Sequence, residues 1–157
     1  MYPDKIIRHK GIEMGVLSDA PFIGARICAI DCHYNCPGCF NQHLRTEKYI
    51  TETAMTMIAR IVNHGLAEGI ILGGLEWTEQ SEEMLGLIKV AQYFKLKVMI
   101  YTHHTLNQFL DMFPDLQGQD IYLKCGEYRK DVKGYVDKEN DVILASDNQR
   151  IYNLKNI

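Results

Sequence analysis

Residues 28–42 read "CAIDCHYNCPGCFNQ" and contain four of the five cysteines in the chain. Three of them, Cys32, Cys36 and Cys39, have the spacing C-x3-C-x2-C. A structural zinc site needs a fourth ligand, which Cys28 or His33 would have to supply. A [4Fe–4S] cluster held by three thiolates instead keeps one iron open to a substrate. The spacing therefore favours an iron–sulfur cluster that takes part in chemistry, with zinc as the alternative.

The composition is that of an ordinary globular domain. Of 157 residues, 46% are hydrophobic and 24% charged, so we expect residues 1–157 to form one domain. The net charge of −3 and the scattered Lys and Arg residues predict no nucleic-acid binding. No apolar run approaches the ~20 residues of a membrane helix, and the N-terminus has no signal-peptide core. We therefore expect a cytoplasmic protein without membrane contact, whose thiols stay reduced.

Apolar runs and helical periodicity alternate along the chain. The runs predict strands at 25–30, 69–74, 97–102 and 120–125, and the periodicity predicts helices at 51–65, 81–94 and 105–113. Alternating strands and helices predict an α/β fold with a parallel sheet. Because four or five strands are too few for a closed eight-stranded barrel, we expect a partial (open) βα barrel of about four to five mostly parallel strands.

Polar and glycine residues follow three of the predicted strands. The cysteines follow the first strand, Gly73 and Gly74 end the second, and Thr102 and His103 follow the third. In open α/β sheets, ligands bind at the carboxyl ends of the strands. These residues are therefore expected to form one site.

The C-x3-C-x2-C motif resembles that of the radical S-adenosylmethionine superfamily. Within it, "CHYNCPGCFNQ" looks like the cysteine loop of the anaerobic ribonucleoside-triphosphate reductase activating enzymes. Near the other end, "SDNQRIY" (146–152) is similar to their S-x-N-Q-R segment. The resemblance covers nearly the whole chain and implies a fold of the radical S-adenosylmethionine type.

The resemblance implies two cofactors, a [4Fe–4S] cluster on Cys32, Cys36 and Cys39, and S-adenosylmethionine. Reductive cleavage of the second would yield a 5′-deoxyadenosyl radical and then a glycyl radical on a large anaerobic ribonucleotide reductase. An electron donor such as flavodoxin or ferredoxin is implied as well. No catalytic protein residue is needed beyond the cluster and the cofactor.

The resemblance also implies a set of cofactor contacts. They are Gly38, Phe40, Gly73, Gly74, Glu76, Thr102 and His103. The chain departs from the family where "GGLEW" moves the acidic residue by one position and lacks the proline, and where "KCGEY" replaces a common "DGK". These departures leave open a radical enzyme that acts on a small molecule or a peptide. A non-catalytic zinc-binding module is the remaining alternative.

Several other residues have more than one reading. Cys28 is expected to be a small core residue, and Cys125 either a core residue or part of the site. Trp77 is either a lid or an aromatic that faces a partner. Residues 146–150 are expected to line the site or a partner surface, on the resemblance alone.

Overall fold

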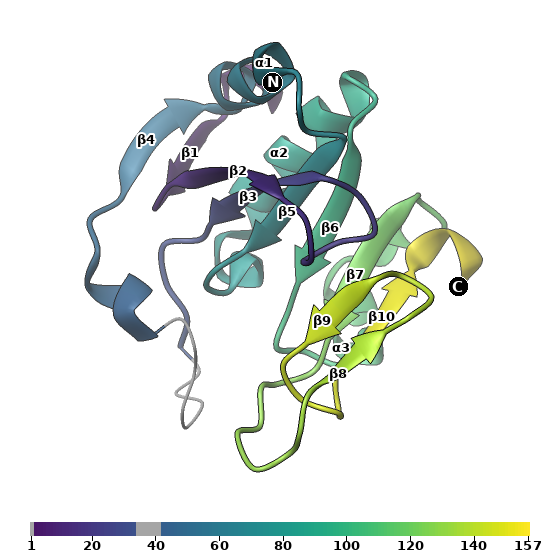
Figure 1. Cartoon of the computed structure of the whole chain (residues 1–157). Helices are drawn as coiled ribbons and strands as arrows, with labels where there is room; N and C mark the ends of the chain where they lie inside the picture. Colours follow the sequence, from purple (N-terminus) through teal and green to yellow (C-terminus); the bar gives the residue numbers. More distant parts are fainter. Residues whose placement is uncertain (1, 34–41) are drawn as a thin grey trace.

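The computed structural model describes residues 2–33 and 42–157, which form a mixed α/β fold (Figure 1). The predicted site residues Cys36, Gly38, Cys39 and Phe40 lie outside the described residues. Within them, the largest sheet has six strands. In spatial order these are β10 (Arg150–Asn153), β7 (Ile121–Cys125), β6 (Lys97–Tyr101), β5 (Gly69–Gly73), β3 (Gly24–Cys28) and β2 (Ile12–Val16).

The inner strands of this sheet are parallel, and the edge strands are antiparallel. β3, β5, β6 and β7 pair in parallel, whereas β2 and β10 pair antiparallel with their neighbours. Every residue of β5 is buried, as expected of a strand covered on both faces. These four parallel strands confirm the strands predicted from apolar runs, to within two residues at each end. The description of the sheet as an open barrel stays a prediction.

In the described part of the chain, three α-helices cover one face of the sheet. They are α1 (Ala54–His64), α2 (Ser81–Tyr93) and α3 (Leu106–Met112). Figure 1 shows α2 behind β5 and β6, and Met84, Leu87 and Ile88 of this helix belong to the same buried cluster as Ile70 and Leu72 of β5. Burial of these aliphatic side chains is the main stabilising contribution of this layer.

The start of α1 differs from the prediction. A helix from residue 51 was expected, but Ile50–Thr53 form strand β4, which pairs antiparallel with β1 (Ile6–His9). Thr53 therefore becomes the N-cap, and its side chain accepts a hydrogen bond from the Thr56 N–H at 3.1 Å. Pairing with a distant strand outweighs the local helical pattern.

The opposite face of the sheet carries a short hairpin of β8 (Tyr135–Asp137) and β9 (Val142–Leu144). Val142 and Leu144 are buried, and the Ile143 N–H donates to the Ser18 carbonyl at 3.2 Å. The Tyr135 hydroxyl donates to the carbonyl of Gln149 at 2.9 Å. The hairpin is thus tied both to the connection between β2 and β3 and to the segment before β10.

Short 3₁₀ helices complete the described secondary structure. They are η1 (Tyr2–Asp4), η2 (Gln42–Thr46), η3 (Trp77–Gln80), η4 (Pro114–Leu116) and η5 (Leu154–Asn156). Among the helices in the described part of the chain, none has the length and apolar character needed to cross a membrane.

Candidate functional site

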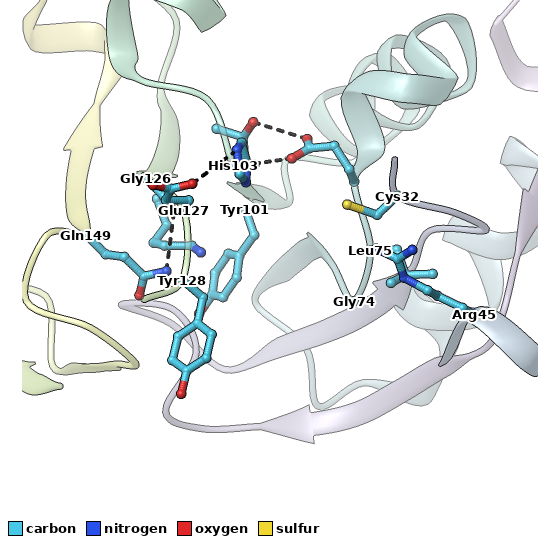
Figure 2. Close-up of a pocket in the computed structure, with 13 residues that line it drawn as sticks. Cys32, Arg45, Gly74, Leu75, Tyr101, His103, Gly126, Glu127, Tyr128 and Gln149 are labelled. Carbon is cyan, nitrogen blue, oxygen red and sulfur yellow. Dashed lines mark hydrogen bonds and ion pairs between the residues drawn. The ribbon is translucent and has the colours of Figure 1, made fainter. Parts of the chain in front are cut away.

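The carboxyl ends of β3, β5 and β6 meet at one edge of the sheet and form a pocket (Figure 2). Cys32 follows β3, Gly74 and Glu76 follow β5, and Thr102 and His103 follow β6. All five line the pocket. The structure therefore brings together five of the site residues that the sequence predicts. Since the strands are parallel, their carboxyl ends are adjacent, although the residues are far apart in the sequence.

The two glycines after β5 have different roles. Gly73 remains in the strand, where its carbonyl accepts hydrogen bonds from the Ala29 N–H at 3.1 Å and from Trp77 Nε1 at 3.2 Å. Gly74 has a φ of +82°, and a Cβ there would lie 2.4 Å from Cys28 Sγ. The turn that borders the pocket at Gly74 is therefore packed directly against β3.

Cys28 is buried, as the sequence predicts. Its thiol donates to the Ala29 carbonyl at 3.3 Å, and burial raises its pKa above the usual value. The Cys28 side chain therefore packs as a small core residue against the turn at Gly74.

The Glu76 carboxylate lies in the pocket wall and is 3% exposed. It accepts hydrogen bonds from the Thr78 hydroxyl at 2.9 Å, from the Thr102 hydroxyl at 3.1 Å and from the His103 N–H at 2.6 Å. The Thr78 N–H is a fourth donor at 3.4 Å, so these donors together occupy the about four acceptor positions of a carboxylate. Glu76 thus ties the segment after β5 to the end of β6.

His103 and Lys124 contribute basic groups to the pocket. Burial lowers the pKa of His103, and the nearby carboxylates of Glu127 and Glu76 oppose this shift only in part. The imidazole is therefore mainly neutral at pH 7. Lys124 Nζ lies 4.6 Å from the centre of the Tyr101 ring, a cation–π contact. The pocket thus combines a neutral imidazole, an ammonium group and carboxylates.

The segment 146–150 supports one wall of the pocket. Gln149 lines the pocket, and its Nε2 donates to the Gly126 carbonyl at 3.3 Å (Figure 2). Asn148 Nδ2 donates to the carbonyl of Glu127 at 2.8 Å. Both side chains hold the loop after β7, whose residues Gly126, Glu127 and Tyr128 face the pocket.

Sequence reasoning missed several residues of the pocket. They are Arg45, Leu75, Tyr101, Lys124, Gly126, Glu127 and Tyr128. The alternation of apolar and polar residues along "IYLKC" in β7 is a sequence signal that would have separated Lys124 from Cys125. Loop residues carry no such periodic signal.

Cys125 and Trp77 belong to the core. Cys125 is 5% exposed and belongs to the main core cluster, and burial raises its pKa to about 12. Trp77 is fully buried, and its indole N–H donates to the carbonyl of Ile27 at 3.0 Å. Trp77 is therefore neither a lid nor an aromatic that faces a partner.

The described residues are compatible with a cluster at this edge of the sheet. Cys32 is half-buried and borders the pocket, and its N–H donates to Asp31 Oδ1 at 2.7 Å. Among residues 2–33 and 42–157, no three His, Cys, Asp or Glu side chains form a metal-binding group, and Cys32 is the one motif cysteine in these ranges. Together with Cys36 and Cys39 of the sequence motif, Cys32 would supply the three thiolates that a cluster with one open position needs.

Comparison with known proteins identifies the family. A family model described as "4Fe-4S single cluster domain" matches residues 23–152, which are 130 of the 157 residues. A search of curated proteins and a search of solved structures gave no match. The matched range contains all three motif cysteines and every described wall of the pocket. The chain therefore belongs to the 4Fe-4S single cluster domain family.

Proposed function

We propose that the chain is a radical S-adenosylmethionine activating enzyme. Its family supports a [4Fe–4S] cluster, and the C-x3-C-x2-C spacing suits a cluster with an open iron. The observation that carries the proposal is the position of Cys32, which borders the same pocket as Gly74, Glu76 and His103. In this proposal the sheet is an open βα barrel with its active site at the carboxyl edge.

Three cysteines would hold the cluster, namely Cys32, Cys36 and Cys39. A reduced cluster held there would supply the one-electron reduction of S-adenosylmethionine on which formation of a glycyl radical depends. The protein itself supplies binding, orientation and electrostatics. No protein acid or base is required for the cleavage.

The pocket has groups that suit the methionyl part of S-adenosylmethionine. Lys124 and Arg45 line it with positive charge, which favours a carboxylate. Gly74 brings backbone close to the pocket without a side chain, and Glu127 lines the pocket with a second carboxylate, which attracts an ammonium group. We therefore assign cofactor binding to the strand ends of β5, β6 and β7.

The proposed acceptor of the radical is a glycine on a large glycyl radical enzyme, most specifically an anaerobic ribonucleotide reductase. The support is the similarity of "CHYNCPGCFNQ" and "SDNQRIY" to that family of activating enzymes. Asn148 and Gln149 of the second segment hold the loop at the pocket. A flavodoxin or ferredoxin is the proposed electron donor.

The test is anaerobic reconstitution followed by reaction with S-adenosylmethionine and a reductant. We expect methionine and 5′-deoxyadenosine as products, and a glycyl radical signal in electron paramagnetic resonance when the reductase is added. A loaded cluster that neither binds nor cleaves S-adenosylmethionine would refute the radical mechanism. Stoichiometric zinc in place of iron would support the zinc-binding module.

A second candidate is a radical enzyme that acts on a small molecule or a peptide. It is favoured by Glu76, which is displaced by one position in the sequence and whose carboxylate is bonded to Thr102 and His103. Such a change in the pocket wall suits a different substrate on the same cofactors. Deuterium exchange between 5′-deoxyadenosine and a small substrate, with no radical on the reductase, would select this candidate.

A further inference from the structure

The stem of the cysteine loop, residues 29–33, lies along the segment 73–80. Backbone hydrogen bonds join the two at two points. They run from the Ala29 N–H to the Gly73 carbonyl at 3.1 Å and from the Glu76 N–H to the Asp31 carbonyl at 3.0 Å. The stem therefore leaves β3 in a direction that the segment after β5 determines.

Two side chains of η3 continue this contact. The Ile30 N–H donates to Gln80 Oε1 at 2.9 Å, and the His33 N–H donates to Glu79 Oε2 at 2.8 Å. These two amides lie on either side of Cys32. Gln80 and Glu79 thus hold the backbone around the first motif cysteine. They lie 50 and 46 positions after the residues whose N–H groups donate to them.

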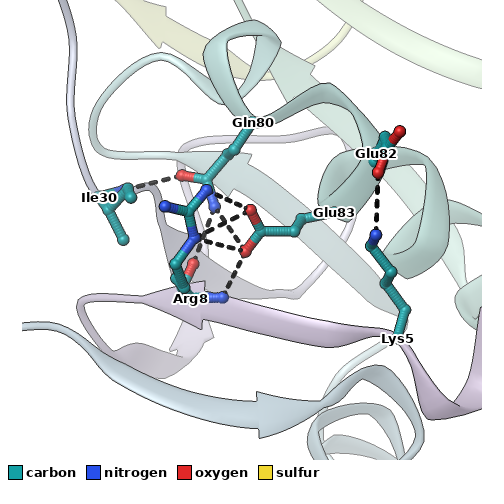
Figure 3. Close-up of polar contacts among 6 residues, drawn as sticks. All are labelled: Lys5, Arg8, Ile30, Gln80, Glu82 and Glu83. Carbon is teal, nitrogen blue, oxygen red and sulfur yellow. Dashed lines mark hydrogen bonds and ion pairs between the residues drawn. The ribbon is translucent and has the colours of Figure 1, made fainter.

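Gln80 is itself held rigidly (Figure 3). It is 5% exposed, and its Nε2 donates to the Arg8 carbonyl at 2.9 Å and to Glu83 Oε1 at 3.3 Å. Glu83 in turn accepts from the Arg8 N–H at 2.5 Å and from Arg8 Nη2 at 2.6 Å. The amide of Gln80 therefore has its donor side and its acceptor side engaged, which fixes its orientation.

This network joins three distant parts of the fold. Arg8 lies in β1, Glu83 lies in the first turn of α2, and Ile30 lies in the stem. Gln80 is the residue that bonds to all three. The position of the stem thus depends on β1 and α2 through one buried amide.

We propose that Gln80 is a positioning residue for the iron–sulfur site, and that it fixes the direction in which the stem presents Cys32. The proposal goes beyond the proposed function, since it needs the cluster of the family but neither S-adenosylmethionine nor a partner. Without the Gln80 oxygen, the Ile30 N–H has to turn toward water, and the stem moves with it. Mutation of a group that hydrogen-bonds to a metal ligand and orients it typically lowers metal affinity by about 10–100-fold.

The test compares Gln80→Met with Gln92→Met in the full chain. Both replace an amide by an apolar side chain of similar size. Gln92 lies on α2, where its Nε2 donates to Gln119 Oε1 at 2.9 Å, away from the stem. Each protein is loaded with iron and sulfide without oxygen and then exposed to an iron chelator. The decay of the visible absorption of the cluster gives its rate of loss.

We expect Gln80→Met to lose its cluster about three to ten times faster than wild type. The effect is smaller than the typical one because Gln80 bonds to the backbone two residues before Cys32 and not to a metal ligand itself. Gln92→Met should lose its cluster at the wild-type rate, because among the described residues Gln92 makes no contact with the stem. The electron paramagnetic resonance spectrum of the reduced cluster should broaden in Gln80→Met alone. Wild-type loss rates in Gln80→Met, or equal acceleration in both variants, would overturn the proposal.

A second variant covers the case in which Gln80→Met does not fold, as judged by circular dichroism of the metal-free protein. Glu83→Gln keeps an oxygen for Gln80 Nε2 but removes the charge that Arg8 binds. Its cluster should be lost about twice as fast as that of wild type. A wild-type rate in this variant would overturn the proposal. Since no assay here uses S-adenosylmethionine, failure of the proposed function would leave these results unchanged.

Discussion

Replacing Gly74 by Ala would place a methyl group in the tightest contact beside the pocket. The residue has φ +82°, where a side chain costs about 1 kcal/mol or slightly more. The added Cβ would also lie 2.4 Å from Cys28 Sγ and 3.1 Å from Cys28 Cα. Because Cys28 is a residue of β3 and pairs with Gly73, its backbone cannot move aside easily. Overpacking of this kind costs about 2 kcal/mol, so we expect a total of about 3 kcal/mol.

Gly65→Ala is a matched control for the backbone contribution. Gly65 has φ +81° at the end of α1, and no atom of the described residues lies within 4 Å of its added Cβ. Its substitution should therefore cost only about 1 kcal/mol, the backbone part of the loss. Adding Cys28→Ala to Gly74→Ala removes the sulfur from the contact and should restore about 1 kcal/mol.

Urea denaturation of the metal-free proteins, followed by circular dichroism, gives the free energy of unfolding for each variant. Equal losses for Gly74→Ala and Gly65→Ala would refute the contact between the turn and β3. A double variant no more stable than Gly74→Ala would show that the sulfur is not the source of the clash.

Three further predictions concern charge, thiol reactivity and iron. Arg60, with a smaller contribution from His9, lowers the pKa of Glu52 from 4.5 to about 2. The stabilisation of the folded state that follows from this shift is fully present above pH 4.5 and is lost as the pH falls through 2. The free energy of unfolding of Glu52→Gln, measured by urea denaturation at pH 7, should therefore be lower by about 2 kcal/mol. This is less than the full pKa shift would give, because Arg60 is half-exposed and solvent screens the pair. An unchanged free energy of unfolding would contradict this prediction. Cys125, with a pKa of about 12, should resist iodoacetamide at pH 8 in the native protein and react after unfolding, as mass spectrometry would show. Alanine at Cys32, Cys36 or Cys39 should reduce the iron content from about four per chain to near zero, while Cys125→Ala retains it; a motif variant that keeps its iron would be evidence against these ligands.

The parallel strands could be predicted because each is a short, mainly apolar run. In β5 every residue is buried, whereas in β7 buried residues alternate with partly exposed ones. The pairing of β1 with β4 could not. Both strands mix polar and apolar residues, and Ile50–Thr53 directly precede a helix whose pattern they extend. The partner of β4 lies more than forty residues earlier in the chain, at Ile6–His9. A local pattern does not contain such pairing.

The candidate site was predictable in its residues but not in its contacts. Strand ends and the family resemblance pointed to Glu76, Thr102 and His103, yet their mutual hydrogen bonds join positions 26 and 27 residues apart. No sequence pattern predicted the role of Gln80, because one buried amide does not produce a periodic pattern of residues. Trp77 was ambiguous because an aromatic residue after a strand suits a core and a surface equally well, and burial alone decides between them.

The wall held by Gln149 also affects the order in which the site is assembled during synthesis. Gln149 follows Cys32 by 117 residues in the sequence. At about 5–20 residues per second, a ribosome needs roughly 6–25 s to go from one to the other. During that time the cysteine loop exists without Gln149 and the loop after β7 that this side chain secures. The pocket wall at the loop after β7 can therefore be complete only once Gln149 has been synthesised, well after Cys32.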